Sequence, residues 1–156
     1  MEIRFATIND LIELARLNDQ IQAHHAELYP NTYRYPLDQN EVSTFFKKLI
    51  NSNDNEVLVA ASHESLLGYL FYERQCFLGN VFKFERNRYY IHHIVVDKRN
   101  WRTGIGSALF DYLDTIAKKA NVHEFALDTM AKNTDAQKFF EHGNFSKNKL
   151  TYSRQL

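Results

Sequence analysis

The sequence has few of the residues that stabilise secreted or irregular chains. Its 156 residues include one cysteine, two prolines and five glycines. A single thiol, Cys76, cannot form an internal disulfide, so we expect a cytoplasmic protein. No stretch reaches the roughly 18 apolar residues of a membrane span, and the first residues lack the apolar core of a signal peptide. We therefore expect no membrane association.

An excess of charge of one sign is also lacking, because 19 basic residues balance 19 acidic ones. Nucleic-acid-binding proteins usually carry a clearly basic face, so we expect no nucleic-acid partner. Apolar and aromatic residues are abundant instead: hydrophobic residues make up 44% of the chain, with 12 Phe and 9 Tyr. This content, without repeats or a linker, predicts one compact domain over residues 1–156.

Apolar periodicity predicts how strands and helices follow one another. Strand patterns cover residues 2–7, 56–62, 66–75, 88–97, 124–129 and 149–155, and helix patterns follow Asn9 or Asp10 and cover residues 40–50, 104–120 and 133–142. Residues 76–87 fit a strand, a loop or both. Early strands follow one another through hairpins and later ones are separated by helices. This order predicts an α/β fold with a single mixed, mostly antiparallel central sheet flanked by helices.

The segment from Tyr89 to Phe110 carries the clearest chemical signal. An apolar strand ends at Val96-Asp97, and Gly104-Ile105-Gly106-Ser107 opens a helix. Glycines let the backbone approach a ligand, and the free N–H groups at a helix start attract an anion. Arg99 and Arg102 add positive charge that suits phosphate. The segment predicts a phosphate site, although a turn that only caps a helix fits the same residues.

Three phosphate-binding motifs compete for this turn. A P-loop requires Gly-Lys-Ser or Gly-Lys-Thr, which is absent. A dinucleotide-binding fingerprint requires Gly or Ala at the position of Leu109. The remaining motif binds the pyrophosphate of CoA.

The stretch Ile94–Leu109, centred on Arg102-Thr103-Gly104-Ile105-Gly106-Ser107, resembles the signature of the GNAT superfamily of acetyl-CoA-dependent N-acetyltransferases. Residues 133–145, with the pair Phe139-Phe140, are similar to a second feature of that family, and so is the opening Ile3-Arg4-Phe5-Ala6-Thr7. The resemblance covers nearly the whole chain in the right order. It implies a GNAT-like acyltransferase fold and the transfer of an acetyl group from acetyl-CoA to a primary amine.

The resemblance also implies which residues bind acetyl-CoA. These are the end of the central strand, the glycine turn and the last helix: Ile94, Val95, Val96, Arg102, Thr103, Gly104, Ile105, Gly106, Ser107, Asn133, Phe139 and Phe140. Asn133 also suits a helix N-cap. Two positions depart from the family. Trp101 stands where relatives have Arg or Gln, and Phe140 stands where many relatives have the Tyr that protonates the departing thiolate.

Acetyl transfer needs a general base, because an alkyl ammonium with a pKa near 10 is no nucleophile. In relatives a Glu of the central strand often serves, and that position falls at His92, with His93 beside it. A histidine with an ordinary pKa of about 6.5 suits this task. Adjacent strand residues point to opposite faces, so we expect only one of the two to face the cleft. Both also fit as ordinary strand residues.

The remaining candidates are weaker. Tyr152, in the last expected strand, is a candidate general acid, although an ordinary aromatic fits there too. Tyr33, Arg34 and Tyr35 fit either the border of an acceptor site or a packed loop. We expect no metal site, because His24-His25 have no further ligand at suitable spacing.

Three functions stay open at this stage: an N-acetyltransferase, a domain that binds CoA without turnover, and a regulatory partner domain. The expected partners of the first are acetyl-CoA, as acyl donor, and an amine-bearing acceptor. The sequence does not decide whether the chain forms a homodimer.

Overall fold

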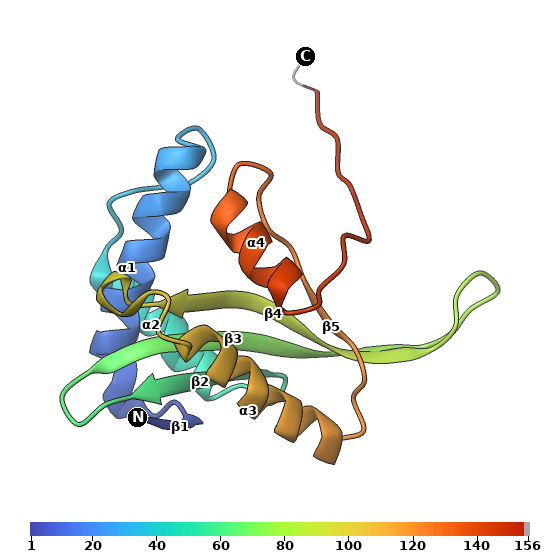
Figure 1. Cartoon of the computed structure of the whole chain (residues 1–156), viewed down its shortest axis with the longest axis horizontal. Coiled ribbons are helices and arrows are strands. Elements are labelled where there is room, and N and C mark those ends of the chain that lie inside the picture. Colours follow the sequence, from blue (N-terminus) through green and yellow to red (C-terminus); the bar gives the residue numbers. More distant parts are fainter. Residues whose placement is uncertain (155–156) are drawn as a thin grey trace.

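The computed structural model, described here for residues 1–154, is built on one five-stranded sheet (Figure 1). The strands β1 (Glu2–Phe5), β2 (Asn55–Ala61), β3 (Leu66–Phe77), β4 (Arg86–Val96) and β5 (Phe125–Leu127) lie side by side in chain order. Neighbours are antiparallel from β1 to β4, whereas β4 and β5 are parallel. The expected mixed, mostly antiparallel sheet is confirmed.

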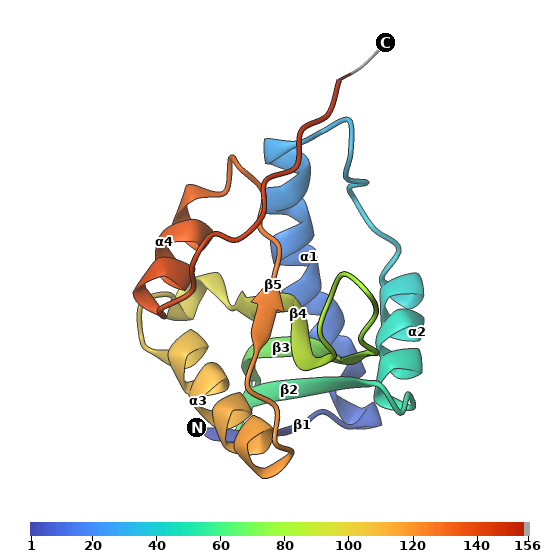
Figure 2. The ribbon, with the colours of Figure 1, turned by 90° about the vertical axis from the view of Figure 1, so that its right-hand side faces the viewer.

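The helices cover both faces of the sheet (Figure 2). The helices α1 (Leu11–Leu28) and α2 (Gln39–Ile50) pack on one face, and α3 (Ile105–Lys119) packs on the other, with α4 (Thr134–His142) near its N-terminal end. Short 3-10 turns precede α1 (Ile8–Asp10) and follow β4 (Lys98–Asn100). No helix within residues 1–154 is both long and apolar enough to cross a membrane.

Alternation along the strands divides the core into two layers. In β2, Val57 and Val59 face α1 and α2, while Leu58 and Ala60 face α3. The first layer is closed by Leu14, Leu17 and Phe46, and the second by Leu109 and Leu113. The two helix pairs are thereby fixed on opposite sides of β4, the strand that carries the candidate site.

The ambiguous stretch 76–87 is the end of the long β3–β4 hairpin, which projects beyond the rest of the sheet (Figure 1). Its tip exposes four large apolar side chains, of Leu78, Val81, Phe82 and Phe84, to between 90% and 95%. These side chains therefore add nothing to either core layer.

The expected last strand is absent from the described residues, and that prediction is wrong. Residues 145–154 contain no strand, and Leu150 and Tyr152 are 73% and 88% exposed. The remaining residue of that prediction, Gln155, lies outside the described part of the chain. Alternation alone does not make a strand, since a strand also needs a ladder partner. The outer strand β5 is only three residues long and offers little ladder.

Candidate active site

A β-bulge in β4 places both histidines on the same face of the sheet. The register pairs Phe71 with His93 and Tyr72 with Ile91, so His92 is an extra residue without a partner. Both imidazoles lie against Phe71, His92 stacked with ring centroids 4.7 Å apart and His93 edge-on at 5.6 Å. The expectation that only one of them faces the cleft side is wrong, because a bulge breaks the alternation of side chains.

His92 is paired with a carboxylate on the neighbouring strand. Its Nε2 lies 3.1 Å from Oε2 of Glu73, and both side chains are 34% exposed. The hydrogen bond from Gln75, assisted by His92, holds the pKa of Glu73 below its ordinary value. The charged carboxylate accepts the Nε2 proton, which leaves Nδ1 with the lone pair that can take a second proton.

His93 has a different environment one residue further on. Its Nδ1 lies 3.1 Å from the hydroxyl oxygen of the fully buried Tyr69. Burial, with smaller contributions from nearby His92 and His25, lowers the pKa of His93 to about 4. His93 is therefore neutral at pH 7, with one ring proton, and it does not gain a second proton near neutral pH.

The second half of β4 has a free edge on its β5 side. The two strands pair only at residues 89–91, and within the described chain no strand pairs with that edge of residues 92–96. Tyr90 donates a 2.6 Å hydrogen bond to Asp128, and burial together with this carboxylate raises the pKa of Tyr90 to about 12. The backbone of Ile94, Val95 and Val96, expected to bind acetyl-CoA, thus lies where β5 no longer covers β4.

The glycine turn after β4 has the geometry of an anion site. Gly104 is the N-cap of α3 with φ of 87°, and nothing lies within 4 Å of the position that a Cβ would take. The backbone N–H groups of Ile105, Gly106 and Ser107 belong to the first turn, where a helix provides no acceptor. Beside them Arg102 is exposed and has no ion pair within residues 1–154. These residues fit a pyrophosphate.

Gly106 has a packing role that the sequence does not reveal. A Cβ at this position would meet the ring of Phe139 at 2.9 Å, so the glycine allows α4 to approach α3. Phe140 is turned inward, 9% exposed, and packs against Phe145 with centroids 5.7 Å apart. Of the aromatic pair, only Phe139 therefore lies against the glycine turn.

Asn133 is the N-cap of α4, as expected. Its Oδ1 accepts a hydrogen bond from the Ala136 N–H at 3.2 Å, and the side chain is buried. The family departure at Trp101 also has a structural role. The indole Nε1 donates to the Val96 carbonyl at 2.8 Å and so joins the turn to the end of β4.

An ion-pair cluster of Asp97, Arg16 and Arg99 lies at the end of β4, and the sequence did not predict it. The carboxylate of Asp97, 1% exposed, accepts hydrogen bonds from Arg99 at 2.7 Å and Arg16 at 2.6 Å. These bonds, Arg99 first, hold the pKa of Asp97 far below its ordinary value. Because Arg99 is ion-paired with Asp97, Arg102 is the arginine of the two that is available to a phosphate. No sequence pattern joins Arg16 to a residue 81 positions away.

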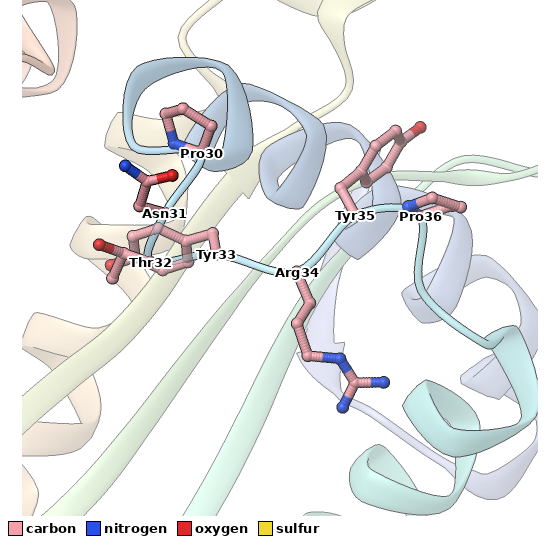
Figure 3. Close-up of a pocket in the computed structure, with 7 residues that line it drawn as sticks. All are labelled: Pro30, Asn31, Thr32, Tyr33, Arg34, Tyr35 and Pro36. Carbon is pink, nitrogen blue, oxygen red and sulfur yellow. The ribbon is translucent and has the colours of Figure 1, made fainter.

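Two hollows lie on the α1–α2 side. The first, about 400 Å³, is formed by the loop residues Pro30–Pro36 alone, with Arg34 and Tyr35 extending in opposite directions (Figure 3). The second, here called the His93 cavity, is about 220 Å³ and lies between α1, α2 and β4. Its walls are Asn18, Gln22, Leu37, Glu41, Val42, Phe45 and His93. Only the second hollow contains a candidate catalytic residue.

The end of α1 is fastened to the segment before α4. The Lys132 N–H donates to the Tyr29 hydroxyl at 3.2 Å, and its Nζ donates to the Leu28 carbonyl at 3.1 Å. These contacts connect α1, on one face of the sheet, with the segment that leads into α4, on the other face.

Tyr152 is not part of this arrangement. It lies in the irregular C-terminal segment, which leaves the sheet (Figure 1), and forms no hydrogen bond within the described residues. Among residues 1–154, no group of three or more His, Cys, Asp or Glu side chains is placed to hold a metal ion.

Residues 18–144 match the model of the acetyltransferase (GNAT) family. No curated protein matches the sequence.

Solved structures share the fold at low sequence identity. The tetramutant of the BH1408 protein from Bacillus halodurans is 24% identical, with a TM-score of 0.92 and all of both chains covered. The aminoglycoside 6'-N-acetyltransferase from Acinetobacter haemolyticus is 16% identical, with a TM-score of 0.76, over 100% of this chain and 99% of that one. The ribosomal-protein-alanine N-acetyltransferase from Brucella melitensis is 20% identical, with a TM-score of 0.71 and both chains covered fully. With its matching family model, its mixed sheet and its glycine turn at the start of α3, this chain belongs to the GNAT family of acetyltransferases.

Proposed function

We propose that this chain is an N-acetyltransferase that moves an acetyl group from acetyl-CoA to a primary amine by direct attack. One observation carries the proposal: His92, which is paired with Glu73 of β3, lies on the same strand as residues 94–96 of the free edge and just before them. The glycine turn that follows supplies free N–H groups for the pyrophosphate. The proposed base His92, the strand edge at residues 94–96 for the thioester and the glycine turn for the pyrophosphate therefore follow one another along one segment.

The pair provides the proton transfer that the reaction requires. His92 accepts a proton from the ammonium at Nδ1, directly or through one water, and Glu73 stabilises the resulting imidazolium through Nε2. The amine nitrogen then attacks the thioester carbon, the C–S bond breaks and the thiolate leaves, while the nitrogen releases its remaining extra proton to water to give the neutral amide. A backbone N–H at the free edge of β4 is suited to stabilise the oxyanion.

No general acid is needed in this scheme. Phe140 has no proton to give. A thiol with a pKa of about 8.5 leaves tolerably as thiolate near neutral pH, with water as the eventual proton source. Loss of the base has no such remedy, since most acceptor amine is protonated at pH 7.

The test is release of free CoA thiol from acetyl-CoA with a panel of primary amines. We expect release with the native chain, and His92→Ala should lower turnover on the order of a hundredfold. Calorimetry with acetyl-CoA, run in parallel, separates loss of binding from loss of chemistry. Unaltered turnover in a folded His92→Ala variant, across pH 6 to 7.5, would show that the base lies elsewhere.

A second candidate function is CoA binding without turnover. It is favoured by the two family departures, Trp101 and Phe140, of which the second removes the usual acid. Heat of binding with acetyl-CoA, but no thiol release with any amine, would select this candidate.

A further inference from the structure

A chain of three side chains fixes the hydrogen atoms around His93. The Asn18 Nδ2 group donates to the Tyr69 hydroxyl at 3.0 Å, and that hydroxyl lies 3.1 Å from Nδ1 of His93. An amide nitrogen donates and does not accept. Within residues 1–154 the proton of the buried Tyr69 hydroxyl has no acceptor other than His93, so it points to Nδ1, which carries the lone pair that accepts it. In the neutral ring the remaining proton is then on Nε2.

Nε2 is the ring nitrogen of His93 that Tyr69 does not occupy. It forms no hydrogen bond within residues 1–154. In that part of the chain, Tyr89 Oη is the one side-chain polar atom that is both sealed from solvent and without a partner, so Nε2 of His93 keeps some contact with solvent. Because His93 lines the cavity, Nε2–H is the donor it presents there. Burial keeps this ring neutral, as its lowered pKa indicates, so it does not repel an ammonium group.

The other cavity walls define what fits beside this donor. Asn18, Gln22 and Glu41 are polar, and Glu41 is an exposed carboxylate whose ion pair with Arg34 is long, at 3.9 Å, so it adds negative charge that attracts a cation. Leu37, Val42 and Phe45 are apolar. A volume of about 220 Å³ exceeds the roughly 150 Å³ of a cavity that admits benzene, so it has room for a group as large as an aromatic side chain.

We infer that Asn18 and Tyr69 hold His93 as a fixed Nε2–H donor, which binds a carbonyl or hydroxyl oxygen of the acceptor. The preferred acceptors are then amines with such an oxygen close to the amino group, such as amino alcohols and amino amides. The two adjacent histidines have different roles: His92 accepts the proton of the ammonium group, and His93 donates a hydrogen bond without giving up its proton. Asn18 and Tyr69 are positioning residues. This inference rests on the proposed function, because it assigns the acceptor subsite of that reaction.

The tautomer can be read without turnover, from long-range proton–nitrogen NMR of the ¹⁵N-histidine-labelled protein. We expect His93 to show a bare Nδ1 and a protonated Nε2, with no titration between pH 5.5 and 8. Tyr69→Phe, which keeps the ring packing, should produce a mixture of tautomers. A proton on Nδ1 in the native chain, or charging of His93 near pH 6.5, would overturn the inference.

Acceptor selection is tested with two matched amines of equal length, an amino alcohol and an alkyl amine. We expect the KM of the alkyl amine to exceed that of the amino alcohol by about tenfold, as for one hydrogen bond. In His93→Phe this ratio should fall to about one. The ratio compares two substrates on the same variant, so general damage to the fold cancels. Equal KM values in the native chain, or an undiminished ratio in His93→Phe, would refute the assignment.

Failure of the proposed function looks different. If no amine releases thiol, the same two amines are titrated into the labelled protein with CoA present. A shift of the His93 Nε2 signal with the amino alcohol alone upholds the donor, while no shift with either amine refutes it.

Discussion

The buried carboxylate of Asp97 offers the sharpest test of how the glycine turn is held in place. It accepts four hydrogen bonds, from the backbone N–H, Nε and Nη2 of Arg99 and from Nη1 of Arg16. Asp97→Asn keeps the volume but removes the charge, and its new amide N–H₂ faces arginine donors. Arg16 itself is 32% exposed and is bound to Glu13 and to the Leu66 carbonyl, so it cannot simply turn to water.

The expected loss follows from the burial of the two partners. Breaking a buried ion pair from one side costs about 3–5 kcal/mol. Arg99 is 71% exposed and regains water, so only the part due to Arg16 counts fully. We therefore expect Asp97→Asn to lower the free energy of unfolding by about 2–3 kcal/mol, and Tm by about 5–10 °C for a chain of this size. Urea unfolding and calorimetry measure both.

Acid titration gives the same interaction a second signature. The folded-state pKa of Asp97 lies below the unfolded value of 3.8, so its stabilisation is present above pH 3.8. It is lost as pH falls below that value toward the folded-state pKa. Asp97→Asn should abolish this part of the acid sensitivity and weaken acetyl-CoA binding. The matched control is Asp114→Asn, an exposed carboxylate on α3. Equal unfolding midpoints for the two variants would refute the reasoning.

Further substitutions test other parts of the site and core. Gly104→Ala places a Cβ in open space at φ of 87°, so we expect about 1–2 kcal/mol of lost stability from strain and weaker acetyl-CoA binding by calorimetry; unchanged binding would remove Gly104 from the anion site. Gly106→Ala should lower Tm through contact with Phe139, whatever its effect on the ligand, and a native Tm would contradict the packing role. Tyr89→Phe removes a buried hydroxyl without a hydrogen-bond partner in the described chain, so urea unfolding should show equal or higher stability, and a clear loss would reveal a hidden partner. Glu73→Gln should lower turnover while leaving acetyl-CoA affinity unchanged, and full activity would show that His92 does not need the Glu73 carboxylate.

Much of the fold could be predicted because its signals are local. Apolar periodicity fixes α3 and the strands of the first hairpins, and glycines at 104 and 106 mark the start of α3. The cap at Asn133 also depends on a contact only three residues away. Such features are set within one or two turns of the chain, where sequence spacing and spatial distance agree.

The rest depends on contacts between distant segments. The alternation of side chains predicted a strand at residues 149–155 just as it did for the strands of the sheet. Only the assembled sheet decides whether such a segment finds a ladder partner. The bulge at His92 is set by the register of β3 against β4, and it turns two neighbouring histidines to one face. Tyr69 and Asn18 then give His93 a fixed tautomer, and Glu73 gives His92 a charged partner. The sequence by itself determined the family, the glycine turn and the candidate histidines. The different surroundings of the two histidines were decided by the tertiary structure, because the residues that bury them and bond to their rings come from β3 and α1, far away in the sequence.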